Sequence, residues 1–504
     1  MTTSTVAHAA PRAGRREWTG LAVLALPALL ASLELTVTHL ALPSIGADLG
    51  ASSTQLLWIV DVYAFLLAGS LITMGALGDR IGRRRLLLIG GTAYGLASVL
   101  AAYAPDPATL VAARALMGVA GSTLMPSVLA LTAALFADPR QRTTAIGIVI
   151  ASVSGGTAIG PLVGGWMLDR FWWGSAFLLG VPVMVVLLAV GPFLLPEHRA
   201  PGSGRLDVTS ALLSLAAVLP VVYGLKRIAA DGPDAGSAGA VAAGLVAAAL
   251  FARRQRRLAD PMIDLRLFAD RAFGAAVAVL ALGIFVLWGS NYAVAQYLQL
   301  VQGRAPLDAG LWTAPSAAGV IAGSMLAPRL VRRIAPGTVI GVGLAVSAVG
   351  YGILTQVTPE SGLGLLVTGT VVVSAGLGPM MALATDIVVG SAPPERAGAA
   401  SAISSTSPQL GGALGIAVVG SVITAVYRGA MSGANPEAAR DTLGTAVSAA
   451  AALPGPAGPA LLESARTAFT DGFRLTAGIS AALMVLTAVL AVAVLSRISR
   501  NEDT

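Results

Sequence analysis

The chain contains no cysteine, and only 11% of its residues are charged. The absence of cysteine excludes a disulfide framework, a thiolate nucleophile and metal sites built on cysteine. An ordinary soluble domain carries about 25% charged residues, so this chain has too few charges to cover a surface that faces water. Its 504 residues are instead 56% hydrophobic, with a mean hydropathy of +0.80. These values exclude a soluble enzyme and a disordered protein, and they indicate an all-α polytopic membrane protein.

Apolar segments of the length that spans a bilayer recur along the whole chain. A spanning helix needs about 20 predominantly apolar residues, and fourteen segments come near or exceed that length. They are 18–40, 56–77, 86–104, 108–136, 144–168, 173–195, 206–225, 237–252, 272–298, 309–328, 338–356, 362–389, 398–427 and 473–496. The first is too long for a signal peptide and lacks a clear cleavage site, so we expect it to be retained as a transmembrane helix.

The distribution of positive charge predicts on which side the two termini lie. The net charge is +7 and the isoelectric point is near 10.2, values that also occur in nucleic-acid-binding proteins. Here the basic residues cluster in short segments between apolar runs. With the N-terminus inside, 23 of the 32 Lys and Arg residues lie on the inner side and 8 on the outer side. The positive-inside rule therefore places both termini in the cytoplasm, and we expect no nucleic-acid partner.

An arginine-rich turn occurs twice and suggests an internal repeat. The turn 75–84 has a weaker echo at 324–333, and its characteristic residues are Gly75, Asp79, Arg80, Gly82, Arg83 and Arg84. Eight apolar segments separate the two turns, whereas two adjacent six-helix repeats would leave six between them. We therefore predict a 6+2+6 arrangement, since paired repeats are common in transporters. Recurrence through the positive-inside rule alone is the alternative.

This arrangement predicts the division of the chain into regions. They are a cytoplasmic tail (1–17), a first six-helix bundle (18–200), two inserted helices with a cytoplasmic linker (201–271), a second six-helix bundle (272–496) and a second tail (497–504). The second bundle includes a long outer loop over 428–471 that is rich in Ala, Gly and Pro. A small hairpin or lid and a mobile loop are both open for that segment.

Three ionisable residues lie inside the predicted transmembrane helices, where such a group is costly and is by default a functional candidate. They are Glu34, Asp61 and Arg114, and Asp386 lies nearer the cytoplasmic end of its helix. Trp58 and Phe65 share a helical face with Asp61. An ionised carboxylate between aromatic rings suits a lipophilic cation, whereas burial favours a protonated carboxyl group. Proton and cation could then compete for Asp61; a static hydrogen-bond network is the alternative.

Arg114 is the one basic residue in the interior of a predicted transmembrane helix, and an unpaired charge there would be costly. Glu34 is the obvious candidate for its counter-charge. An ion pair with Arg114 and a second protonation site are both open for Glu34. His39, near the outer end of the same helix, is more typical of a structural residue than of a proton relay.

Two further patterns fall on single helical faces. Glycines recur every fourth residue in one segment and leave a smooth strip for a neighbouring helix; the strip comprises Gly156, Gly160, Pro161, Gly164 and Gly165. The other pattern is a stripe that could line a cavity, formed by Phe285, Trp288, Tyr292 and Gln296. Ordinary helix packing is the alternative for both. The chain has no Walker-type nucleotide loop and no HExxH metal motif, so we expect no ATP drive and no metal.

Several of these motifs together resemble the major facilitator superfamily. The turn 75–84 is similar to its cytoplasmic loop signature, and the strip 156–165 resembles its fifth-helix antiporter motif. Arg114 with the glycines that follow is similar to the fourth-helix motif, although Met117 stands where glutamine is usual. The segment 33–43 resembles the first-helix motif of the fourteen-helix drug:proton antiporters, with glutamate in place of the usual aspartate. The resemblance covers essentially the whole chain.

The resemblance implies a proton-driven exporter of lipophilic cationic small molecules in the bacterial cytoplasmic membrane. Its substrates would be dyes, quaternary ammonium compounds and drugs, including fluoroquinolones in some members. Asp61 and Glu34 would be the carboxylates of the cation and proton pathway, and the turn 75–84 would act in gating. Some members carry acids in the tenth and thirteenth helices for divalent cations; here those helices have none, so we expect mostly monocations.

The resemblance also implies that the proton gradient replaces any cofactor, and we expect a monomer. Two other functions remain open at this point. One is a narrow exporter of a single natural product with the same fold, and the other is a membrane sensor or assembly protein that transports nothing.

Overall fold

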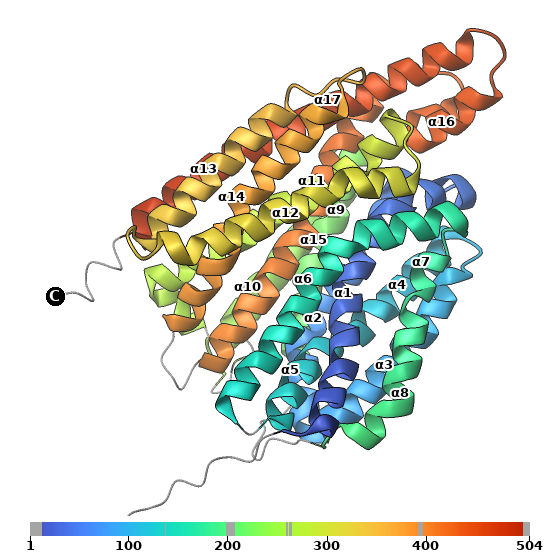
Figure 1. Cartoon of the computed structure of the whole chain (residues 1–504). Helices are drawn as coiled ribbons and strands as arrows, with labels where there is room; N and C mark the ends of the chain where they lie inside the picture. The colour runs from blue at the N-terminus through green and yellow to red at the C-terminus, as the bar shows by residue number, and fades with distance from the viewer. Residues whose placement is uncertain are drawn as a thin grey trace, which may run out of the picture.

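The computed structural model describes residues 13–136, 138–197, 207–258, 261, 265–391 and 397–496. Within these residues the chain is helical and contains no strand. Residues 1–12 of the first predicted tail, all of the second tail and residues 259, 260 and 262–264 of the predicted linker lie outside the described residues. Figure 1 shows the helices of the first half, blue to green, beside those of the second half, yellow to red.

Each of the fourteen predicted apolar segments lies in a helical part of the chain. The first half comprises α1 (Arg15–Leu49), α2 (Ser53–Ile81), α3 (Arg83–Ala102), α4 (Pro107–Gly121), α5 (Leu124–Leu135), α6 (Pro139–Arg170), α7 (Ser175–Leu178) and α8 (Gly180–Leu194). A hairpin of α9 (Val208–Asp231) and α10 (Ala235–Gln255) follows. The second half comprises η1 (Leu265–Ala269), α11 (Arg271–Gln296), η2 (Tyr297–Val301), α12 (Pro306–Leu330), α13 (Pro336–Leu354), α14 (Leu363–Gly390), α15 (Ala397–Ala430), η4 (Glu437–Arg440), α16 (Leu443–Ala452), α17 (Ala457–Leu490) and η5 (Ala491–Leu495).

Twelve helical stretches among the described residues are long and apolar enough to cross a bilayer. The helix α12 is not among them, because glycine, serine, threonine and proline lower its apolar content. Of α6, only Thr144–Val153 counts as an apolar stretch, and it is shorter than a span. These two helices pack against each other. The predicted count of fourteen therefore stays a prediction, and so does the cytoplasmic location of both termini.

The predicted span 108–136 is not one helix but two. The break falls at Ser122 and Thr123, between α4 and α5. Pro126 has no backbone N–H to donate to the carbonyl of Ser122, four residues earlier. At the same break, the Ser122 and Thr123 hydroxyls donate to the carbonyls of Val119 and Ala120, at 2.7 Å each. The proline thus explains an interruption that hydropathy alone does not reveal.

The segment 428–471, predicted as a long outer loop, is largely helical. It contains η4, α16 and the first turns of α17, which begins at Ala457 rather than near 473. Leu461, Ala465 and Ala468 are buried in these turns, where α17 packs against α16. We call residues 431–456 the distal hairpin; Figure 1 shows its helix α16 beyond the end of the bundle. The sequence left a small hairpin and a mobile loop open for this segment, and the structure shows the hairpin.

Two large cores form, one in each half. The first draws buried residues from α1 to α8 and also takes Tyr292 and Ile416 from the second half. The second draws on α11 to α17 and takes Leu40 from α1. A small third core joins Phe65 of α2 to Val222 of α9 and to α15, so the inserted hairpin lies beside the seam between the halves.

The two halves meet closely at the end of the bundle that carries the α1–α2 turn. We call this end distal and the end at which α1 begins proximal. The side-chain amide of Gln299 donates to the Leu40 carbonyl at 3.0 Å. A Cβ on Gly310 would lie 2.0 Å from the Pro161 carbonyl, and one on Gly420 would lie 2.3 Å from Leu57. These contacts close the distal end between the halves.

Candidate functional site

Among the side chains that the structure describes, three buried charged ones lie in the first half, on three different helices. Asp61 of α2 and Arg114 of α4 have an exposed fraction of 0%, and Glu34 of α1 has 2%. Because the surrounding helices are apolar, each of these charges must be offset by a specific partner or by a change of protonation state. The partners of the three differ.

Arg114 is held by groups from several helices. Its Nη1 donates to Glu34 Oε1 in a buried ion pair, and its Nε donates to the Ile59 carbonyl at 3.0 Å. The guanidinium also lies over the ring of Tyr63, 4.2 Å from the centroid, which favours a cation. The structure therefore pairs Glu34 with Arg114, the first of the two alternatives left open by the sequence, and ties α1, α2 and α4 together.

Asp61 lies at the seam between the two halves. Phe65, one turn further along α2, is buried against Val222 of α9 and the α15 residues Ala413 and Ala417. Leu57, one turn before Asp61, and Tyr292 of α11 in the second half both pack close to Gly420 of α15. Trp58 is only partly buried. A change of charge at Asp61 would thus be felt by helices of both halves.

The predicted stripe on α11 divides in the structure. Tyr292 and Gln296 line a cavity at the distal end, with Tyr292 only 6% exposed. Trp288 instead lies over Gly412 of α15, where a Cβ would come within 2.2 Å of its ring. Phe285 meets α15 through its backbone carbonyl, close to Gly415. The spacing therefore correctly places the four residues on one face of α11. Only the distal part of that face lines a cavity, because its proximal part packs against α15.

The turn between α2 and α3 is organised by an acid that sequence reasoning missed. Glu197, just after α8, accepts the Arg84 N–H at 3.2 Å and forms ion pairs with Arg84 at 3.7 Å and Arg85 at 3.9 Å. Gly82 has φ +111°, a conformation that favours glycine, and packs directly on the Glu197 carboxylate. The sequence does contain a signal for Glu197: it is an acidic residue directly after an apolar segment, in a protein that has an arginine-rich turn to balance.

The other residues of this motif are placed less tightly. Arg80 is exposed and Arg83 partly buried, while Gly75 lies near Pro126 of α5. The side chain of Asp79 lies outside the described residues. The motif therefore forms a turn held to the end of α8, and its gating role stays a prediction.

The glycine strip on α6 lies against α1. A Cβ on Gly156 would lie 2.3 Å from the Leu29 carbonyl, one on Gly160 would contact Thr36 at 2.9 Å, and one on Gly164 would contact Val37 at 2.8 Å. The opposite edge of the strip meets α12: Gly165 packs on Leu307. A similar arrangement recurs in the second half, where Gly411 and Gly415 of α15 pack on backbone carbonyls of α11.

We expect Gly156→Ala to force α1 away from α6, since the added methyl group would overlap the Leu29 carbonyl. Such overpacking costs about 1–3 kcal/mol. Gly155→Ala is the matched control, because nothing lies within 4 Å of its Cβ position and both changes gain the same helix propensity. Thermal unfolding of the purified variants measures the difference; equal melting temperatures would contradict the close packing.

Among the described residues no three His, Cys, Asp or Glu side chains gather in a group that could hold a metal ion. The buried ionisable groups described in the first half include two carboxylates, the His39 imidazole and one guanidinium that lies over the rings of Tyr63 and Phe177. Such groups can bind or release a proton, or attract an organic cation, without forming covalent bonds. The arrangement is suited to binding and transport.

Comparisons with known proteins agree with this geometry. The family model of the Major Facilitator Superfamily matches residues 24–416. The chain is 43% identical over 492 residues to the multidrug efflux pump LfrA of Mycolicibacterium smegmatis, covering 96% of this chain and 97% of that protein. It is 34% identical to the methyl viologen resistance protein SmvA of Salmonella typhimurium, over 94% and 97% of the two chains.

Two further comparisons bear on substrate range and on fold. The tetracenomycin C resistance and export protein of Streptomyces glaucescens is 31% identical to this chain, over 97% of it and 94% of that protein. A solved structure of a bacterial Spinster homologue in an inward-facing, unoccupied conformation matches with a TM-score of 0.69 and 18% identity, over 97% and 98% of the two chains. At that identity the likeness shows the fold alone.

Proposed function

The chain belongs to the major facilitator superfamily, and from this premise we propose that it is a proton-coupled antiporter that exports lipophilic cationic drugs, dyes and quaternary ammonium compounds by alternating access. It is a multi-pass protein of the bacterial inner membrane and a transporter rather than an enzyme. Its relatives are drug-resistance efflux pumps. Proton coupling, cationic substrates and the 6+2+6 arrangement with cytoplasmic termini are parts of the proposal.

The observation that carries the proposal is the division of roles between two buried carboxylates. Glu34 forms an ion pair with Arg114, and Asp61, equally buried, lies at the seam between the halves, between Leu57 and Phe65 of α2, which both pack on α15. A carboxyl group in such a position can be neutralised by a proton or by a cationic substrate. Competition between these two ligands for Asp61 is the simplest way to couple their opposite movements.

The order of steps in the transport cycle then follows from the charge on Asp61. Outward release of the cation would accompany protonation of Asp61 from the distal side, and loss of that proton to the cytoplasm would prepare the site again. The close distal contacts between the halves support a state in which the distal exit is shut. The proton gradient supplies the energy, and no cofactor takes part.

Gradient-driven transport of ethidium tests this proposal. We expect proteoliposomes with an acidic distal side to move ethidium toward that side, and we expect a protonophore that collapses the gradient to stop the movement. Liposomes without protein are the control. Well-folded protein that moves no ethidium, with or without the gradient, would contradict the multidrug proposal.

A narrow exporter of one natural product is the second candidate. It is favoured by the similarity to the tetracenomycin C resistance and export protein over nearly the full length of both chains. Resistance profiles of cells that express the chain separate the two candidates. Protection against several unrelated cationic compounds supports the multidrug exporter, and protection against a single compound supports the narrow one.

A further inference from the structure

A small polar cavity lies at the distal end, between the start of α2, α11, α15 and the distal hairpin. Its volume is about 30 Å³, which is too small for a drug but sufficient for water, since one water molecule needs about 10–15 Å³ measured in this way. Its polar lining includes Ser53, Tyr292, Gln296, Thr424, Tyr427 and Asp441. These side chains come from both halves of the protein and from the hairpin that covers them.

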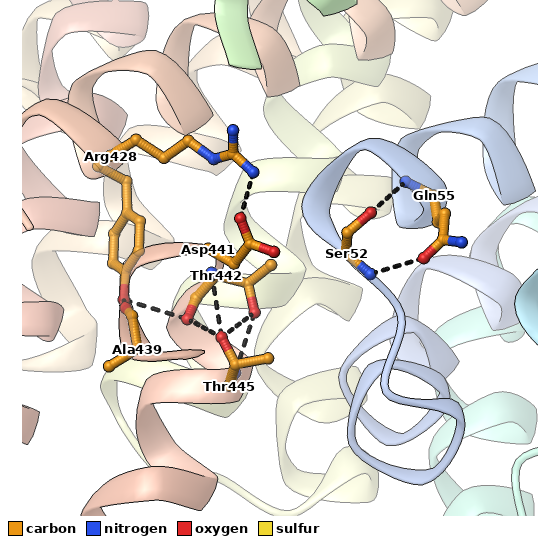
Figure 2. A network of polar contacts seen from close by, with 8 residues as sticks. Ser52, Gln55, Arg428, Ala439, Asp441, Thr442 and Thr445 are labelled. Carbon is orange, nitrogen blue, oxygen red and sulfur yellow. Dashed lines mark hydrogen bonds and ion pairs between the residues drawn. The ribbon is translucent and has the colours of Figure 1, made fainter. Parts of the chain in front are cut away.

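The roof of the cavity is formed by the distal hairpin. The Tyr427 hydroxyl donates to the backbone carbonyls of Ala439 at 2.8 Å and Thr442 at 3.1 Å, which holds the hairpin in place. Asp441 forms an ion pair with Arg428 of α15, and its side chain is 43% exposed. Figure 2 shows Asp441 between Arg428 and the start of α2. Asp441 is thus a carboxylate that contacts both the solvent and the cavity.

The floor of the cavity lies toward Asp61. Tyr292 and Gly420 both line the cavity, and a Cβ on Gly420 would lie 2.3 Å from Leu57 and 3.3 Å from the Tyr292 ring. Leu57 stands one helical turn before Asp61 on α2. The buried Ser53 hydroxyl, 8% exposed, also lines the cavity and has no hydrogen-bond partner within the part of the chain that the structure describes. A water molecule in the cavity would satisfy this hydroxyl, since buried polar groups are nearly always hydrogen-bonded.

We propose that this cavity is the entry path of the coupling proton, in which water held beside Ser53 carries protons from Asp441 at the distal surface to Tyr292 and on to Asp61. The inference rests on the proposed proton coupling and names its route. Asp441 takes a proton from solvent and passes one to the water; the water passes one to the Tyr292 oxygen, whose own proton goes to Asp61. Each relay group ends with the protons it began with, and Asp61 gains one.

Other charged and titratable groups flank this path. Arg428 faces Asp441 from α15 and competes for its carboxylate. The His39 ring of α1 packs edge-on against Tyr292, with ring centroids 6.2 Å apart. On the far side of Asp61, Arg114 donates to the Ile59 carbonyl and pairs with Glu34. The positive charge of Arg114, near the Asp61 end of the path, is therefore already neutralised by Glu34.

The test compares two variants that break the same ion pair. Asp441→Asn removes the carboxyl group that carries protons, whereas Arg428→Gln leaves it. We expect Asp441→Asn to slow gradient-driven ethidium efflux by about tenfold or more, and Arg428→Gln to lose far less. Exchange of labelled for unlabelled ethidium, which moves no net proton, should persist in both. Equal losses in the two variants would assign Asp441 a purely structural role and overturn the proposal.

Two additional variants distinguish a loss of proton transfer from a folding defect. Asp441→Glu should restore efflux, and Ser53→Ala should slow it without disturbing the hairpin. Glu437→Gln on the same hairpin is the matched control, because that side chain is 89% exposed and does not line the cavity. Normal efflux in both Asp441→Asn and Ser53→Ala refutes the path alone, whereas the absence of gradient-driven efflux in the unmodified protein refutes the proposed function.

Discussion

Replacing Asp61 by asparagine is expected to abolish gradient-driven efflux, with a loss of about a hundredfold or more. Asparagine has nearly the same shape as aspartate, so the packing around this fully buried position should persist. It can neither take up a proton nor balance a cation, and both are required of Asp61 by the proposed cycle. Ethidium efflux from proteoliposomes under an imposed pH gradient measures the loss.

Asp386→Asn is the matched control for this experiment. It makes the same chemical change at an exposed carboxylate near the end of α14, and we expect it to retain efflux. Size-exclusion profiles and melting temperatures of both variants should match those of the unmodified protein. If the Asp61 variant transports as well as the Asp386 variant, Asp61 is not the coupling residue and the competition mechanism is wrong.

Arg114→Met is expected to destabilise the protein strongly. The change removes the partner of Glu34, which is 2% exposed, and leaves that carboxylate in an apolar site without a counter-charge. Breaking one side of a buried ion pair costs about 3–5 kcal/mol. Thermal unfolding of the protein in detergent, followed by the fluorescence of its tryptophans, measures this loss.

The double variant Glu34→Gln with Arg114→Met separates the ion pair from other causes. Because it removes both charges, we expect it to recover much of the stability that Arg114→Met loses. No recovery would indicate that Arg114 stabilises the fold mainly through the Ile59 carbonyl and the Tyr63 ring. Proton-coupled efflux by a folded double variant would show that Glu34 is not a required protonation site.

The helical segments of this protein were predictable from the sequence because lipid leaves the backbone few choices. In a bilayer each N–H and C=O must be satisfied within the segment, so a long apolar run forms a helix. The rule fails where the chain leaves the apolar layer. The helix α16 is apolar but only ten residues long, and the start of α17 carries Glu463 and Arg466. The two pack on each other, and a search for apolar runs of membrane length did not distinguish them from a loop.

The candidate site was only partly predictable. Asp61, Glu34 and Arg114 could be singled out because ionisable residues are rare in apolar segments. Their different roles could not, since Glu34 and Arg114 lie 80 positions apart and many pairings were open. The stripe on α11 had the spacing of one helical face, but spacing does not say which of its residues meets another helix and which meets a cavity.

The sequence by itself determined that this chain is a multi-helix membrane protein with a few charged residues inside its helices. Composition and hydropathy suffice for this, because the bilayer excludes unpaired polar groups wherever they lie in the chain. Only the tertiary structure decided that Glu34 neutralises Arg114, that Asp61 lies at the seam between the halves, and that Asp441 and Tyr292 line one cavity. These contacts join residues far apart in sequence, and they depend on how glycine-lined helices approach each other in space.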